Sequence, residues 1–153
     1  MSDLFESVIS NNASERPAFR QAPPGDYFAK VQGAKKVKAN SGTQGLELTF
    51  TIIDPAQTTL DMEGVELAKC RLRDTIWITE KSLEMAKERL ANINSDTQGN
   101  TISDALDILP GSYVVVRLSH ETQNRDGTVL NTPRLKVDRY YSVAWYTENR
   151  MAA

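Results

Sequence analysis

The sequence has very few of the residues on which most catalytic and metal sites depend. Its 153 residues include a single cysteine, Cys70, and a single histidine, His120. One cysteine excludes a disulfide within the chain and is typical of proteins of the reducing cytoplasm. There is no HExxH or CxxC pair and no Walker-type glycine loop, so neither a zinc site nor a nucleotide site is predicted. We therefore expect a protein without enzyme activity and without a cofactor.

Long apolar runs and an excess of basic charge are absent as well. No run approaches the roughly 18 apolar residues that a membrane-spanning helix needs, and the N-terminus lacks the basic-then-apolar order of a secretory signal. We expect no membrane contact. The formal charge of −2 argues against a wholly basic nucleic-acid binder, although it leaves room for a local basic patch. With 40% hydrophobic and 25% charged residues, the chain has the composition of one ordinary globular domain.

Residues 1–24 form a region of their own. Leu4, Phe5, Val8 and Ile9 suggest at most a short amphipathic turn, and the following NNASERPAFRQAPPG is polar and aperiodic. We interpret this region as an extended or disordered N-terminal arm. Two readings stay open: a solvated tail, or an arm that docks on a neighbouring subunit and builds a homo-oligomer.

Two strands in a hairpin follow the arm. GDYFAKVQGAKKVK places Tyr27, Ala29 and Val31 on one face, and GLELTFTII is the cleanest period-two pattern in the chain. Turn-forming residues 40–42 lie between them, so we predict an antiparallel pair with a basic tip. Asp54-Pro55 ends the second strand, because proline cannot donate to a ladder.

The segment AKCRLRDTIWIT, residues 68–79, predicts a third strand with an unusual outer face. Leu72, Ile76 and Ile78 alternate as a buried face should. Two alternatives stay open for Trp77. A slip of one residue in register would place it in the core. Its ring could also be buried under the loop of residues 55–67 or against a partner subunit. In the first reading the outer face carries Arg71, Arg73, Thr75 and Trp77.

A change to helical spacing marks the middle of the chain. Thr79 is the expected N-cap of a helix over TEKSLEMAKERLANIN. Thr101 and Asp104 then resemble a capping box before a short helix, which Pro110-Gly111 stops. The apolar positions at helical intervals in the first helix are Leu83, Ala86, Leu90 and Ile93.

Two more strands complete the pattern. SYVVVRLSH directs Val114 and Val116 inward, and RLKVDRYYSV directs Leu135 and Val137 inward. A long loop with an Asp-Gly turn signal joins them. Because Tyr140 and the tyrosine after it lie on opposite faces, one of the two belongs to the core. We assign outward positions to Arg117, Arg134, Lys136 and Tyr140.

Three strands, a helical segment and two strands are the element order of the OB-fold. We therefore predict a mainly β protein, a five-stranded Greek-key barrel of OB type with the helical segment between strands 3 and 4. The domain spans residues 25–146, and residues 147–153 form a C-terminal tail. Barrels of this type bind oligonucleotides on the face of their second and third strands, flanked by the loops that join strands 1–2 and 4–5.

The predicted outer face combines the two groups that single-stranded nucleic acid requires. Cations neutralise its phosphates, and flat aromatic rings stack on its unpaired bases. Arg71, Arg73 and Lys36 supply charge, and Trp77 and Tyr140 supply rings. The complete predicted nucleic-acid-binding set is Lys30, Lys35, Lys36, Lys38, Arg71, Arg73, Trp77, Arg117, Arg125, Arg134, Lys136 and Tyr140.

Each of these residues also has an ordinary structural explanation. Exposed arginines on strands commonly serve solvation or edge protection, and lysines at a hairpin tip commonly face water. His120, at a strand end, is expected to be structural or exposed, and Cys70 falls on the core side of its strand as a buried thiol. The coincidence of so many cations and rings on one predicted surface favours nucleic-acid binding.

Several stretches together give the chain a family resemblance. They are PPGDYFAKV, KKVKANSGTQGLELTFTIID, IWITEKSLEMAKERLANI and LPGSYVVVRLSHE with NRDG and PRLKVDRY, spanning roughly residues 23–143. In layout they resemble small bacteriophage single-stranded DNA-binding proteins with an OB-fold. The resemblance implies protection of exposed strands during phage replication or recombination, in the cytoplasm of an infected bacterial host. Many such proteins recruit replication partners through an acidic tail, which the C-terminal YTENRMAA lacks.

We therefore expect a non-enzymatic protein that binds single-stranded DNA without sequence preference. Two alternatives remain open. One is a structural or assembly module of a virion, with its arm and Trp77 buried between subunits. The other is a recombination mediator that mainly contacts another phage replication or recombination protein.

Overall fold

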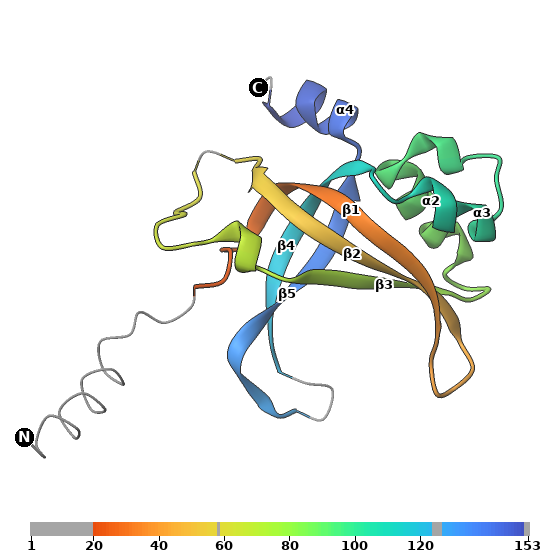
Figure 1. The fold of residues 1–153 in the computed structure, drawn as a ribbon, viewed down its shortest axis with the longest axis horizontal. Helices are drawn as coiled ribbons and strands as arrows, with labels where there is room; N and C mark the ends of the chain where they lie inside the picture. Colours follow the sequence, from red (N-terminus) through yellow and green to blue (C-terminus); the bar gives the residue numbers. More distant parts are fainter. Residues whose placement is uncertain (1–19, 58, 124–126, 152–153) are drawn as a thin grey trace, which may run out of the picture.

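A computed structural model describes residues 20–57, 59–123 and 127–151 of the chain (Figure 1). Its strands are β1 (Gly25–Lys38), β2 (Gln44–Pro55), β3 (Leu72–Ile78), β4 (Tyr113–Gln123) and β5 (Val129–Tyr141). Its helices are α2 (Leu83–Ile93), α3 (Ile102–Ile108) and α4 (Val143–Tyr146), with the short turns η1 (Leu67–Lys69), η2 (Ser95–Thr97) and η3 (Thr147–Met151). Arg125 and residues 1–19 lie outside the described residues.

The five strands form one antiparallel sheet in the spatial order β3-β2-β1-β4-β5. The prediction of a mainly β fold is confirmed. The edge strands β3 and β5 approach each other through side chains, since the Tyr140 hydroxyl donates to the Asp74 carboxylate at 2.5 Å. No backbone ladder joins these two strands in the part of the chain that the structure describes, so the sheet is not closed by main-chain hydrogen bonds.

The core lies on one face of the sheet, and most of it is where the period-two pattern predicts. Tyr27, Ala29 and Val31 are buried, and so are the alternating apolar residues of β2. A bulge between Val31 and Gly33 shifts this pattern by one residue, because Ala34 packs against the core beyond it. The structure also buries ten further residues that the strand and helix patterns place in the core: Leu72, Ile76, Ala86, Leu90, Ile93, Val114, Val116, Leu118, Leu135 and Val137.

The helical segment follows β3 and precedes β4 in the chain, and it lies at one end of the sheet in Figure 1. The predicted capping box of α3 is confirmed, because Thr101 and Asp104 exchange hydrogen bonds between side chain and backbone. Thr79 is not the N-cap of α2; the helix begins three residues later, after Ser82, and these two residues bond to each other instead. Among the described residues, no helix combines the length and apolarity needed to span a membrane.

The C-terminal helix covers part of the outer face of the sheet. Helical structure continues from α4 through η3, across the boundary that the sequence suggested at residues 146 and 147. Tyr146 packs with Val115 and Ala56 in a second apolar cluster, separate from the main core. The outward-facing Val115 is therefore fully buried, and the outer face over β1 and β4 is occupied by the chain itself.

Tyr140 faces the core, contrary to the prediction. Arg139 pairs with Arg117 and Val137 pairs with Leu118, which leaves Asp138 as an extra residue on β5. A β-bulge of one residue reverses the alternation of every side chain beyond it. Tyr140 consequently points inward and is only 4% exposed, with its ring 5.9 Å from that of Phe50.

Residues 20–24, which the sequence analysis assigned to the N-terminal arm, pack against the domain. Arg20 forms an isolated parallel bridge with Val65 and an ion pair with Asp61. Ala22 is fully buried, and its carbonyl oxygen lies 2.7 Å from Nε2 of His120. The folded unit therefore starts by residue 20, and the remainder of the predicted arm falls on residues that the structure does not describe.

Candidate nucleic-acid interface

The outer face of β3 presents the row of side chains that the sequence predicts. Leu72 and Ile76 are 1% and 2% exposed, whereas Arg71 and Arg73 are exposed and Trp77 is half-buried. Strand alternation explains this arrangement, since the two faces of a strand take successive residues. Because Trp77 belongs to neither apolar cluster of the described residues, the alternative register that places it in the core is wrong.

A groove of about 870 Å³ runs along this face and reaches across to β5. We call it the β2–β3 groove. Its arginines offer charge and its threonines offer hydroxyl groups, both of which bind phosphate oxygens. Helix α4 covers the opposite part of the outer face and contributes no residue to this groove. The polar lining consists of Gln21, Glu47, Thr49, Thr51, Arg71, Arg73, Thr75 and Arg134.

Glu47 is a member of this face whose role the sequence analysis missed. Its carboxylate oxygen Oε1 lies 3.5 Å from Nζ of Lys35 and 3.6 Å from Nη1 of Arg73. It lies near the hairpin end of β2, between Lys35 on β1 and Thr75 on β3, and faces outward. One carboxylate thus holds two of the predicted cations in place, and it also competes with phosphate for them.

The indole of Trp77 lies against a glycine on the neighbouring strand. Gly45 pairs with Trp77, and a Cβ atom at Gly45 would lie only 2.8 Å from Cε3 of the ring. A glycine beneath an aromatic ring lets the ring lie close to the strand backbone. The Ser82 hydroxyl also donates to the Trp77 carbonyl at 2.9 Å, which ties this end of β3 to the turn that begins α2. The ring is therefore positioned by its own sheet and still half-exposed.

The predicted lysines of β1 do not share one face of the sheet. Lys35, Lys36 and Lys38 are exposed near the hairpin tip, but only Lys35 pairs with an outward residue, Glu47. Lys36 pairs with the buried Leu46 and lines a small pocket with residues of α3. Lys30 is half-buried further along the strand, with Nζ 5.7 Å above the ring of Tyr113 on β4. Lys35 can therefore join the candidate interface. Contrary to the prediction, Lys36 and Lys38 lie on the other side of the sheet, and Lys30 belongs to the neighbouring part of the outer face.

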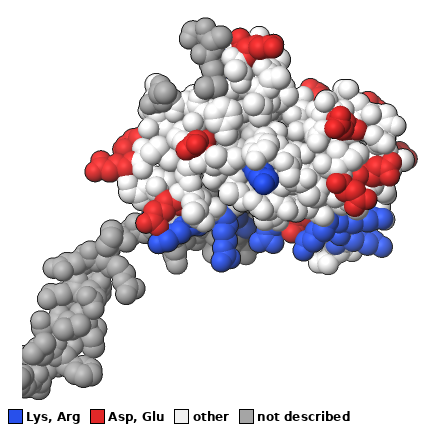
Figure 2. Space-filling model, turned by 45° about the horizontal axis from the view of Figure 1, so that its top comes forward, with Lys and Arg blue, Asp and Glu red and all other residues white. Residues whose placement is uncertain are grey.

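On the face of the molecule that Figure 2 shows, basic side chains gather along one edge. Figure 2 shows Lys and Arg gathered along the lower edge, with Asp and Glu mostly above this edge and at the sides. Such segregation allows a protein with a formal charge of −2 to present a locally positive surface. On β5, Arg134 and Lys136 are exposed and alternate with the buried Leu135 and Val137.

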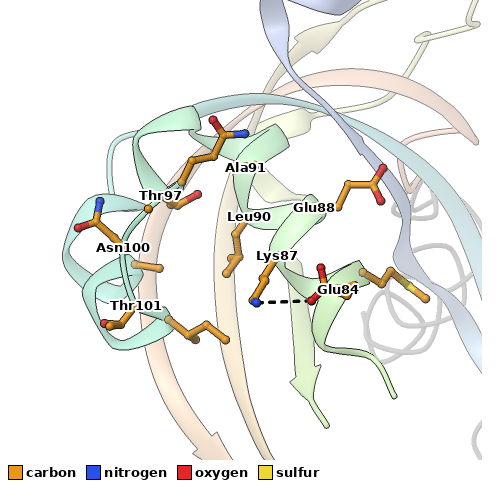
Figure 3. A pocket seen from close by; sticks show the side chains of 13 residues that line it. Glu84, Lys87, Glu88, Leu90, Ala91, Thr97, Asn100 and Thr101 are labelled. Atoms are coloured by element: carbon orange, nitrogen blue, oxygen red, sulfur yellow. Dashed lines mark hydrogen bonds and ion pairs between the residues drawn. The ribbon is translucent and has the colours of Figure 1, made fainter. Parts of the chain in front are cut away.

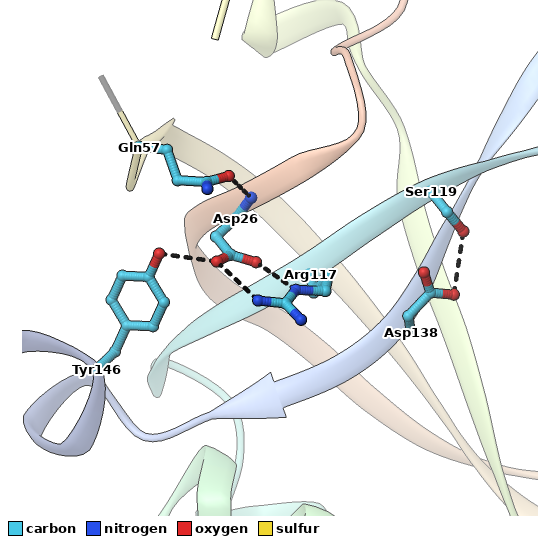
Figure 4. Close-up of polar contacts among 6 residues, drawn as sticks. All are labelled: Asp26, Gln57, Arg117, Ser119, Asp138 and Tyr146. Atoms are coloured by element: carbon cyan, nitrogen blue, oxygen red, sulfur yellow. Dashed lines mark hydrogen bonds and ion pairs between the residues drawn. The ribbon is translucent and has the colours of Figure 1, made fainter. Parts of the chain in front are cut away.

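Arg117 has a structural role in place of the predicted binding role. Its Nε donates to Oδ1 of Asp26 at 2.9 Å, and Nη2 donates to Oδ2 at 3.3 Å (Figure 4). The Tyr146 hydroxyl donates to the same Oδ2 at 2.8 Å, and Gln57 accepts from the Asp26 backbone N–H. Sequence patterns do not predict this network, because its members come from β1, β4, the loop after β2 and α4. The hydrogen bonds to Asp26 raise the pKa of Arg117, so its charge is committed within the fold.

Alkaline titration should reveal the contribution of this network to stability. Burial, and after it the hydrogen bond to Asp26, raises the pKa of Tyr146 from 10.0 to about 12. A tyrosine whose folded pKa exceeds its unfolded value stabilises the fold fully below about pH 10, and this contribution is lost as the pH rises through about 12. In urea titrations we expect the free energy of unfolding to fall between these pH values, and to fall less in the Tyr146→Phe protein. The other buried tyrosines contribute the same loss of stability in both proteins. An equal fall in the two proteins would therefore contradict the role of Tyr146.

Tyr140, the second ring predicted to stack on bases, is instead part of a buried pair. Its hydroxyl donates to Oδ2 of Asp74, the inward-facing acid of β3. Burial raises the pKa of Asp74, and the Tyr140 hydroxyl is the main influence that lowers it again. The pKa of Tyr140 itself lies well above 10.0, chiefly because of burial. This pair joins the two edge strands and leaves Tyr140 no free face for a base.

A hollow of the described surface lies between α2 and α3, away from the predicted face (Figure 3). It has a volume of about 1240 Å³ and an apolar floor that includes Leu90. Its rim carries Glu84, Glu88 and Lys87, and the lysine Nζ lies 3.5 Å from the Glu84 carboxylate. This acidic rim is unsuited to a polyanion.

His120 and Cys70, the single histidine and cysteine of the chain, both contact backbone carbonyl oxygens within the fold. His120 contacts the Ala22 carbonyl, and Cys70 is buried as predicted, with its sulfur 3.5 Å from the Glu66 carbonyl oxygen. Among the described residues, no group of three or more His, Cys, Asp or Glu side chains is arranged to hold a metal ion.

In comparisons with known proteins, no family model matches the sequence and no curated protein is significantly similar to it.

Proposed function

We propose that this chain is a non-enzymatic single-stranded DNA-binding protein that acts without sequence preference. The observation that carries the proposal is the row of Arg71, Arg73 and Trp77 along one side of β3. Arg71 and Arg73 line the β2–β3 groove with Thr75, and Trp77 follows two residues beyond Thr75 on the same side of the strand. In this function the guanidinium groups pair with successive phosphates, and the half-exposed indole stacks on an unpaired base. Every base has a flat face, so such contacts do not select a sequence.

We further propose that the sheet is a five-stranded Greek-key barrel of OB type. Its support is the spatial order β3-β2-β1-β4-β5, with α2 and α3 between β3 and β4 in the chain and a side-chain contact between the β3 and β5 edges. Barrels of this type bind oligonucleotides on the face where the β2–β3 groove lies. The proposed cellular role is protection of exposed strands in phage replication or recombination.

Tryptophan fluorescence tests the proposal directly. The chain has two tryptophans, so Trp145→Phe leaves Trp77 as the only indole. We expect oligo-dT of about 16 nucleotides to quench this emission, with a Kd in the low micromolar range or tighter at low salt, on the order of 10⁻⁶ M. The logarithm of the binding constant should fall with the logarithm of salt concentration by about 0.7 for each phosphate contacted.

Trp77→Ala tests the same contact by removing the ring and measuring the affinity for oligo-dT. Removal of one stacking ring should weaken binding by roughly fivefold to a hundredfold, because a stacked base contributes about 1–3 kcal/mol. The melting temperature should change little, since the ring lies outside both apolar clusters. A large loss of stability with unchanged binding would assign the ring a structural role. Failure of oligo-dT to bind at all would favour the virion assembly module or the protein-binding mediator.

A further inference from the structure

A second groove, on the other side of β5, has the same chemical character as the β2–β3 groove. It lies between α2, the end of β5 and α4, and has a volume of about 810 Å³. We call it the α2–α4 groove. Three arginines line it, Arg89, Arg139 and Arg150, against two acids, Glu88 and Asp138. One of these acids is already engaged, because Asp138 accepts from the Ser119 hydroxyl at 3.0 Å.

The wall of this groove includes an exposed and firmly held tryptophan. Trp145 is 43% exposed, and its ring stacks on that of Tyr141 with centroids 5.4 Å apart and planes 11° from parallel. The guanidinium carbon of Arg150 lies 6.0 Å from the Trp145 ring, and that of Arg117 lies 5.3 Å from the Tyr141 ring. The backbone N–H of Trp145 donates to the Ser142 hydroxyl, which caps α4. A fixed, exposed ring beside cations is the arrangement that stacks on unpaired bases.

The two grooves are connected along β5. Arg134 lines the β2–β3 groove, Arg139 lines the α2–α4 groove, and the exposed Lys136 lies between them. Arg134 and Arg139 are five residues apart on β5, a distance of about 16 Å along a strand, so the two grooves lie close together. Lys136 and Arg89 both lower the pKa of Asp74, which indicates that they lie near the same carboxylate. Cations therefore continue along the strand from one groove to the other.

We propose that the α2–α4 groove is a second single-stranded DNA-binding surface, which takes the segment that leaves the β2–β3 groove along β5. Trp145 stacks on a base of this segment, and Arg139 and Arg150 pair with its phosphates. This inference rests on the proposed function, because it extends the path of the same strand. In this proposal α4 has two roles. It covers the outer face over β4, and it carries the Trp145 ring that stacks on a base.

Two single-tryptophan proteins test the path. Trp145→Phe reports on Trp77, which lies on β3 two residues beyond the groove residue Thr75. Trp77→Phe reports on Trp145 in the second groove while it keeps an aromatic ring on β3. We expect oligo-dT of about 16 nucleotides, a length at the upper end of known single-domain sites, to quench both emissions over the same concentration range. Quenching of Trp77 alone would overturn the second surface and leave the proposed function in place. If neither emission responds and fluorescence anisotropy of labelled oligo-dT shows no binding, the proposed function itself fails.

An affinity measurement complements the fluorescence. The Arg139→Ala/Arg150→Ala protein should bind the same oligo-dT roughly tenfold or more weakly, since two phosphate contacts are lost. Lys81→Ala/Lys87→Ala is the matched control, because it removes the same charge from the turn before α2 and from the opposite side of that helix. We expect the control to bind like the unmodified protein. Equal affinity of both variants, or binding that depends on the second groove but not on Arg71 and Arg73, would overturn the proposed continuous path.

Discussion

Replacing both Arg71 and Arg73 by alanine should lower the affinity for oligo-dT by about 20-fold at 0.1 M salt, because each phosphate contact of a single strand releases about 0.7 counterion. Each contact is then worth roughly fivefold at this salt concentration, and the slope of log K against log salt should become shallower by about 1.4. The measurement is an anisotropy titration of labelled oligo-dT at several salt concentrations. Unchanged affinity and slope would remove the outer face of β3 from the proposed interface.

The folded state should tolerate this double substitution. Both side chains are exposed, and Glu47 keeps its ion pair with Lys35 after Arg73 is removed. Exposed ion pairs contribute at most about 1 kcal/mol, so the melting temperature should move little. The Lys81→Ala/Lys87→Ala protein again controls for the change in net charge. If both double variants bind equally weakly, the loss reflects overall charge instead of a site.

Asp26→Ala should lower the free energy of unfolding by about 2–3 kcal/mol, because hydrogen bonds to charged groups contribute about 1.5–3 kcal/mol and the Arg117 side chain, 36% exposed, stays partly hydrated. The Asp26 carboxylate is almost fully buried, and it accepts hydrogen bonds from both Arg117 and Tyr146. Alanine leaves the guanidinium without its carboxylate and the tyrosine hydroxyl without its acceptor. Urea titration followed by circular dichroism measures the loss, and the melting temperature should fall by roughly 10 °C in a chain of this size.

Asp54→Ala is the matched control for this experiment. Asp54 is an exposed aspartate of β2, so its removal should change stability by at most about 0.5 kcal/mol. Asp26→Asn is a second comparison, because the amide keeps the shape of the side chain and accepts through one oxygen; we expect a smaller loss than with alanine. Equal stability of the Asp26→Ala and Asp54→Ala proteins would contradict the structural role of the network. Because Asp26 lies away from the β2–β3 groove, any Asp26 variant that stays folded should retain oligo-dT binding.

Sequence patterns predicted the strands and much of the site because these features depend on short-range alternation. The burial of Leu72 and Ile76 opposite exposed Arg71 and Arg73 follows from the pleat of a single strand. The capping box of Thr101 is equally local, since its hydrogen bonds span three residues. Such features need no knowledge of the rest of the chain.

Tyr140 shows where alternation fails. Its inward direction depends on the unpaired Asp138, and the bulge is defined only by the register between β4 and β5. Nothing in RLKVDRYYSV distinguishes this register from an unbroken one. Arg117 fails for a related reason, because its partner Asp26 lies 91 residues earlier in the chain.

By itself, the sequence determined the period-two strands, the two helices between the third and fourth strands, and the outward row of Arg71, Arg73 and Trp77, since each is set by neighbours within a few residues. The tertiary structure alone decided that Arg117 and Tyr140 serve the fold, that Gly45 supports the Trp77 ring, and that Trp145 joins three arginines in the α2–α4 groove. The physical reason is that these arrangements depend on strand register and on the packing of distant segments, and a single side chain carries no local mark of either.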